Sequence, residues 1–106
     1  MYYYRAVSWG SGNTGGTKEF SPPSTNFRVV SLMLYTSGNY ENITIKSLKI
    51  GQKEVISNVN AAFTSKDPSK ELEINSELFP KSTEVTMDIS KPSADTVIAV
   101  LKLSDK

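Results

Sequence analysis

The apolar residues of this chain recur in short runs with a period of two, and turn-forming residues separate the runs. Thr83 to Ile89 shows the pattern most clearly, because Val85, Met87 and Ile89 alternate with polar residues. A period of two is typical of β-strands, whose successive side chains point to opposite faces. Seven or eight such segments, with no helical pattern of three turns, predict an all-β fold built as a two-sheet β-sandwich.

The strand-like segments are separated by connections of uneven length, which favours a jelly-roll version of the sandwich. The segments expected as strands are 2–9, 27–36, 43–50, 54–57, 71–74, 83–89 and 96–103. The parity of the apolar residues changes around Lys46 and Ser47, so we expect a bulge or bend there. Single helical turns are expected near residues 61–63 and over residues 75–80.

The chain has 106 residues, which suits one domain and leaves no room for a second. Residues 10–26 contain four Gly, two adjacent Pro and several Ser and Thr. A loop of this length is unusual in a compact domain and is commonly functional or mobile. We therefore expect two parts: residues 1–26, an N-terminal strand with a Gly/Ser/Pro-rich extended arm, and residues 27–106, the β-sandwich body.

Composition excludes several classes of function. The chain has no Cys and no His, which removes thiolate and imidazole metal ligands and the commonest general base. No cofactor and no metal site is predicted. A formal net charge of +1 gives no general attraction to nucleic acid, so no nucleic-acid partner is expected. The longest apolar run, residues 97–101, is far too short for a membrane span.

Two pairs of carboxylates merit comparison with glycosidases, which use two carboxyl groups. Glu71 and Glu73 share one face of an expected strand, as do Glu84 and Asp88. The solvent-facing side of an amphipathic strand typically carries such charges. We therefore predict no catalytic residue, and the chain is expected not to be an enzyme.

Two expected strands are apolar on both faces. In residues 27–36, one face carries Phe27, Val29, Met33 and Tyr35, and the other carries Val30, Leu32 and Leu34. Residues 96–103 alternate in the same way. A two-layer sandwich covers only one face of each sheet, so the second face needs a cover, which is a loop, the N-terminal arm or another subunit. The residues expected at such a subunit interface are Val30, Leu32, Leu34, Ile98 and Val100.

Aromatic residues cluster near the N-terminus. Tyr2 and Tyr4 fall on the same face of the first expected strand, and Trp9 follows at its end. An exposed row of rings could stack on sugars or on a partner protein, whereas buried rings would pack in the core. Tyr2, Tyr4 and Trp9 are the candidates for an aromatic binding platform, with carbohydrate as the ligand of that alternative.

From Ile43 to the C-terminus the chain resembles single jelly-roll structural proteins of bacteriophages and other viruses. The segments that carry the resemblance are Ser47-Leu48-Lys49-Ile50-Gly51-Gln52, Ala62-Phe63, Leu72-Glu73-Ile74 and Val100-Leu101-Lys102-Leu103. The resemblance implies a β-sandwich that assembles through apolar strand faces, as a capsid or capsid-associated component of a virion.

The hypothesis is therefore a self-associating structural protein whose partners are copies of itself and other structural proteins. The alternative is a small carbohydrate-binding or adhesion module that uses the N-terminal aromatic residues. The resemblance implies a virion location. Otherwise, a chain without Cys suits a reducing compartment or a disulfide-free secreted domain.

Overall fold

The computed structural model describes residues 1–63 and 71–106. Its strands are β1 (Tyr2–Trp9), β2 (Gly15–Phe20), β3 (Arg28–Thr36), β4 (Thr44–Ile50), β5 (Lys53–Asn60), β6 (Leu72–Glu73), β7 (Val85–Ser90) and β8 (Val97–Ser104). Two short 3-10 turns accompany them, η1 (Tyr40–Asn42) and η2 (Ala61–Phe63). The all-β prediction is confirmed.

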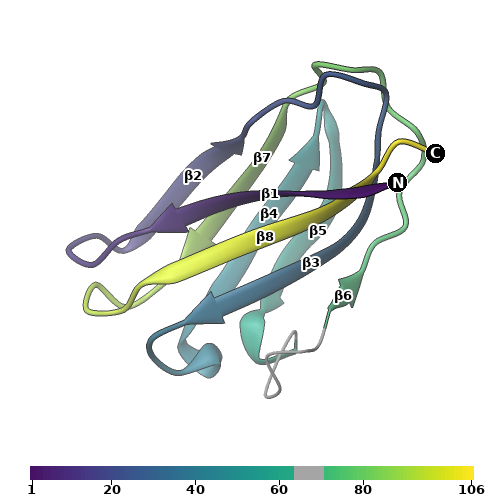
Figure 1. Cartoon of the computed structure of the whole chain (residues 1–106). Coiled ribbons are helices and arrows are strands. Elements are labelled where there is room, and N and C mark those ends of the chain that lie inside the picture. Colours follow the sequence, from purple (N-terminus) through teal and green to yellow (C-terminus); the bar gives the residue numbers. More distant parts are fainter. Residues whose placement is uncertain (64–70) are drawn as a thin grey trace.

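The strands form two four-stranded antiparallel sheets that pack face to face (Figure 1). The first sheet has the order β1-β8-β3-β6, and the second has the order β2-β7-β4-β5. Successive strands therefore alternate between the sheets through much of the chain, which is the arrangement of a jelly roll. The predicted jelly-roll sandwich is thus confirmed.

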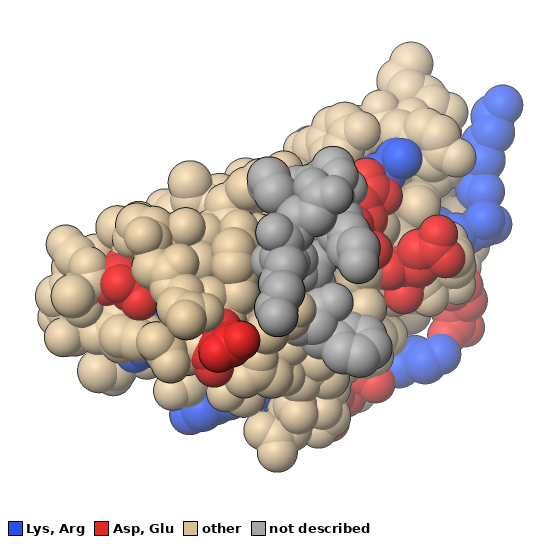
Figure 2. Space-filling view, turned by 90° about the horizontal axis from the view of Figure 1, so that it is seen from below, with Lys and Arg blue, Asp and Glu red and all other residues tan. Residues whose placement is uncertain are grey.

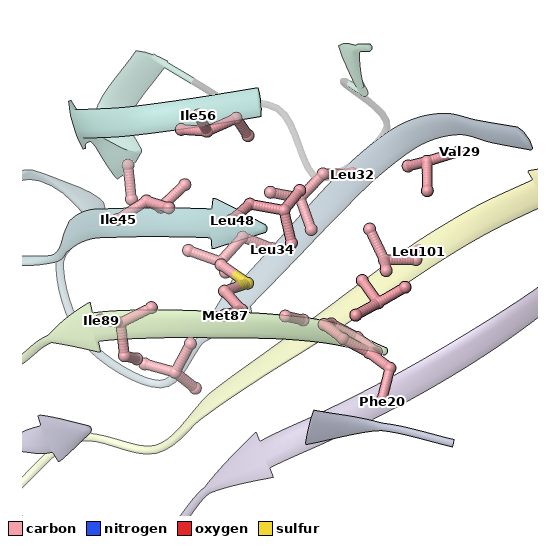
Figure 3. Close-up of a cluster of buried hydrophobic side chains, with 14 of the residues drawn as sticks. Phe20, Val29, Leu32, Leu34, Ile45, Leu48, Ile56, Met87, Ile89 and Leu101 are labelled. Atoms are coloured by element: carbon pink, nitrogen blue, oxygen red, sulfur yellow. The ribbon is translucent and has the colours of Figure 1, made fainter. Parts of the chain in front are cut away.

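The core lies between the two sheets and is entirely apolar at its centre (Figure 3). Leu32, Leu34 and Leu101 of the first sheet face Leu48 and Met87 of the second, and all five are buried. The strand positions predicted as core are also buried: Val85, Met87, Ile89, Val97, Ala99 and Leu101. Alternation of apolar residues therefore identified the inner face of β7 and β8 correctly.

Of three local features predicted from the sequence, two are confirmed and one is wrong. The pairing of β4 with β7 shifts between Ile45 and Ser47, which confirms the expected bulge. The helical turn at Ala61–Phe63 is confirmed as η2. The helical turn expected over residues 75–80 is wrong. Asn75 has a φ of 48° and Phe79 forms a β-bridge with Phe27, so this segment runs as an extended edge of the fold.

The sequence predicts one strand and an extended arm within residues 1–26, and the structure places two strands there, one in each sheet. Residues 2–9 form β1, which pairs with β8 over its whole length, and residues 15–20 form β2, which pairs with β7. Trp9 and Phe20 are each only 1% exposed and belong to the core. Gly15 allows a close approach of β2 to β7, because a Cβ at this position would collide with the main-chain oxygen of Ile89.

A bulge in β3 explains why simple alternation assigns the residues of that strand to the wrong faces. The pairing of β3 with β8 skips one residue between Val29 and Ser31, so Val30 has no opposite partner. The skip changes the parity of the strand. Val29 therefore shares the inner face with Leu32 and Leu34, although simple alternation had put them on opposite faces.

Lys91 holds two loops together at one end of the sandwich. Its side chain is buried, and Nζ donates to the main-chain oxygens of Asn13 (2.8 Å), Pro92 (3.2 Å) and Asp95 (2.7 Å). The Lys91 amide also donates to the Thr14 oxygen at 3.0 Å. The β1–β2 loop and the β7–β8 loop are thus linked around one ammonium group.

Tyr3 has a buried hydroxyl group without a hydrogen-bond partner within the described part of the chain. Burying an unpaired hydroxyl costs about 1–3 kcal/mol. We expect Tyr3→Phe to raise the free energy of unfolding by about 1 kcal/mol, because the ring stays and the unpaired group goes. Urea unfolding measures this. Tyr2→Phe is the control, because Tyr2 is exposed and its change should stay within about 0.5 kcal/mol. A less stable Tyr3→Phe would show that the hydroxyl has a partner in solution.

Candidate interaction surface

The outer faces of the two sheets differ in chemistry. On the second sheet, one row of paired residues across the strands is Thr17, Asp88, Ser47 and Ser57. The next row is Glu19, Thr86, Lys49 and Glu54. Both rows are fully polar, as expected for a sheet face in contact with water.

The outer face of the first sheet is largely apolar. Paired residues across β1, β8 and β3 form one row of Ala6, Val100 and Met33 and a second row of Ser8, Ile98 and Tyr35. A third row brings Tyr4 beside Lys102. We call the surface formed by these residues the apolar outer face: Tyr4, Ala6, Met33, Tyr35, Ile98 and Val100.

Several of these side chains are open to solvent. Ile98 is 45% exposed, Tyr4 is 53% exposed and Tyr35 is 37% exposed. Isolated exposed apolar residues are ordinary on protein surfaces, but a contiguous group on one sheet face is typical of an interaction site. The contrast with the polar outer face of the second sheet makes the apolar outer face the candidate interaction surface.

The structure separates the five residues predicted at a subunit interface. Ile98 and Val100 lie on the apolar outer face, and Val30 lies half-buried at the bulge of β3. The assignment of Leu32 and Leu34 to the interface is wrong. They are 0% and 1% exposed and lie in the core, because the bulge turns them inward. The surface that remains from the prediction is centred on β8.

The three-residue aromatic platform is also divided. Tyr2 and Tyr4 are exposed on the outer face of β1, with Lys102 Nζ 4.5 Å from the centre of the Tyr2 ring. Trp9 is wrong as a platform residue. It has the opposite parity and is buried, and its Nε1 donates to the main-chain oxygen of Gly16 at 3.0 Å.

Sequence reasoning missed Met33 and Tyr35 as surface residues. Both were assigned to the same face as Phe27 and Val29, which the structure places in the core. The sequence carried one signal of the bulge: Ser31 interrupts the apolar run, and its hydroxyl donates to Glu71 Oε2 at 2.9 Å.

A groove of about 550 Å³ lies between the edge strands β5 and β6. Its lining is apolar at Val55, Ile56, Val59, Leu72 and Ile74, while Glu54 and Glu73 contribute carboxylates and Lys53 an ammonium group. Figure 2 views the molecule from below the orientation of Figure 1, and acidic side chains are spread over this side, with more of them, next to Lys and Arg side chains, toward the right of the view. The groove is therefore an apolar hollow with acidic residues in its lining.

The carboxylates considered for glycoside hydrolysis serve other contacts or face outward. Glu71 accepts the hydrogen bond from Ser31, and Asp88 lies in a polar row beside Thr17 and Ser47. Within residues 1–63 and 71–106, no group of three or more acidic residues is placed to hold a metal ion. Over the same residues, no helix has the length and apolar character needed to cross a membrane.

Known structures show where this fold occurs. No protein-family model and no curated protein sequence matches the chain. A capsid structure of the Helicobacter pylori bacteriophage KHP30 contains a chain with a TM-score of 0.53 and 14% identity, and the match covers 99% of this chain and 89% of that chain. The capsid asymmetric unit of the cyanophage Pam1 gives a TM-score of 0.55 and 14% identity, with 97% and 82% covered.

These matches extend across the whole sandwich, including β1 and β2, whereas the sequence resemblance was confined to Ile43 onward. At this level of identity the likeness concerns the fold. The resemblance to jelly-roll structural proteins of bacteriophages is confirmed in that sense, and this chain has the jelly-roll fold found in phage capsid structures.

Proposed function

We propose that this protein is a non-enzymatic structural component of a virion, a capsid or capsid-associated subunit that assembles with copies of itself and with other structural proteins. The observation that carries the proposal is the apolar outer face of the first sheet, in contrast to the polar outer face of the second sheet. The fold shared with the two phage capsid structures supports the same conclusion.

The dimensions of the apolar outer face indicate a weak contact. Its three rows extend roughly 20 Å along the strands and three strands extend roughly 14 Å across, on the order of 300 Å² for each copy. Two such faces together bury less than the roughly 1,200 Å² of a standard stable interface. We therefore expect association that depends on concentration, as suits a subunit held in an assembly by several contacts at once.

The test of this proposal is a charge placed at the centre of the face. Ile98→Lys is expected to weaken self-association at least about tenfold, because the ammonium group would have to be buried without a partner. Light scattering over a range of protein concentrations measures the mass in solution. Ser57→Lys on the outer face of the second sheet is the matched control and should leave association unchanged.

A wild-type protein that remains monomeric at high micromolar concentration would contradict the proposed self-association. Equal effects of Ile98→Lys and Ser57→Lys would show that the association uses a different surface. A monomer would favour the alternative, in which the exposed Tyr2 and Tyr4 rings bind carbohydrate.

A further inference from the structure

Three of the four edge strands carry features that hinder pairing with another strand. Open edges are normally shortened, bulged or twisted to prevent such pairing. β6 has only two residues, and β5 has an extra residue at Val55 and a left-handed Asn58 with a φ of 56°. β2 begins with Gly15 and Gly16, whose φ values are 111° and 121°.

β1 has none of these features. It pairs with β8 in one continuous register over eight residues, and no residue of the strand has a positive φ. Arg5 is its only charged residue. β1 is therefore the one long, regular and mostly uncharged edge among the strands described.

The hydrogen bonding of β8 shows which groups of β1 are open. The Ser37 amide donates to the Thr96 oxygen, so the even-numbered residues of β8 direct their main-chain groups toward β3 and the odd-numbered residues toward β1. Tyr3, Arg5, Val7 and Trp9 of β1 lie opposite the odd-numbered residues of β8, so their main-chain groups form hydrogen bonds with β8. The other residues of β1 direct their N–H and C=O groups away from β8, toward the open edge of the sheet: Tyr2, Tyr4, Ala6 and Ser8.

We propose that β1 pairs antiparallel with β1 of a second copy, so that two first sheets join into one eight-stranded sheet. The inference rests on the self-association proposed above and names a second surface for it. A two-fold axis normal to the sheet keeps outer side chains on the outer side. The apolar outer faces of the two copies then form one continuous surface.

Charge selects the register of this pairing. Two registers keep the side-chain parity and pair seven residues of each strand, one centred on Arg5 and one centred on Ala6. The first places two guanidinium groups directly opposite each other, which is unfavourable. The second places Arg5 opposite Val7 of the other copy and sets the small Ala6 against its own equivalent, so we assign the Ala6 register.

The identity of the two strands explains why a second copy suits this edge. In the Ala6 register, Tyr4 of one strand pairs with Ser8 of the other, so their outward N–H and C=O groups satisfy each other. The Tyr4 oxygen now accepts from the exposed guanidinium of Arg5 at 3.2 Å. Pairing replaces this single contact with a main-chain hydrogen bond from Ser8 of the partner copy.

Because the chain has no Cys, single-cysteine variants can test the register directly. In the assigned register the two Ala6 Cα atoms lie about 5.5 Å apart, within the range that a disulfide spans. Two Ser8 residues, or two Tyr4 residues, lie four positions apart along the strands, roughly 13 Å. Ala6→Cys should therefore form covalent dimers under mild oxidation at least about tenfold faster than Ser8→Cys or Tyr4→Cys alone.

A mixture of Tyr4→Cys and Ser8→Cys, which should each cross-link slowly alone, gives a further check of the register. Tyr4→Cys and Ser8→Cys should cross-link with each other when combined, because these positions are opposite in the assigned register. Equal cross-linking of all variants, or none by Ala6→Cys in a protein that light scattering shows to associate, would overturn the β1 pairing and leave the proposed function standing. A protein that stays monomeric in scattering would overturn both.

Discussion

A variant that lacks residues 1–26 is expected not to fold. The deletion removes β1 from the first sheet and β2 from the second, and it takes Trp9 and Phe20 out of the core. Truncating one such aromatic side chain typically costs about 3–5 kcal/mol, and the whole stability of a domain is about 5–15 kcal/mol. The deletion removes both side chains and the hydrogen bonds of two strands, so its free-energy cost exceeds the stability that the remaining strands provide.

Circular dichroism and the dispersion of amide NMR signals measure this outcome. Removal of Asp105 and Lys106 is the control, because both residues are exposed at the C-terminus and follow the end of β8. That shorter chain should remain folded. A cooperative unfolding transition in the chain of residues 27–106 would show instead that β3 to β8 form an independent body, as the sequence alone had suggested.

The failure to predict β2 from the sequence has a physical cause. Its residues Gly15 to Glu19 are small or polar, so the segment lacks the apolar alternation that identifies a half-buried strand. Phe20 is its only buried residue. Pairing with β7 provides the strand structure, and that pairing connects residues about 70 positions apart, beyond the reach of a local pattern.

The strands that sequence reasoning did identify share a strong local signal. In β7 the apolar residues alternate without interruption, and in β4 the change of parity at Lys46 located the bulge correctly. In β3 apolar residues occupy both faces, so Ser31 alone marks the parity change in the sequence. The candidate surface was accordingly predicted in part: Ile98 and Val100 of β8 were assigned correctly to the outer face, while Leu32 and Leu34 were not.

A large loss of stability is also expected from substitution of Lys91, a residue that neither composition nor periodicity distinguished from the other lysines. Lys91→Met is expected to lower the free energy of unfolding by about 2–4 kcal/mol. The methionine fills much the same space but cannot donate, so the oxygens of Asn13, Pro92 and Asp95 lose the ammonium donor that they share. Hydrogen bonds to a charged donor are worth about 1.5–3 kcal/mol each, and partial access of water to the loops reduces their sum.

Urea unfolding of Lys91→Met against Lys81→Met separates this role from the loss of a positive charge. Lys81 is exposed, so its substitution should change stability by no more than about 0.5 kcal/mol. Hydrogen exchange gives a local readout, because the Gly12 amide donates to the Ser93 oxygen across the same two loops. Its exchange should accelerate in Lys91→Met before the core amides respond. If both variants unfold at the same urea concentration, water replaces the ammonium group and Lys91 does not hold the loops together.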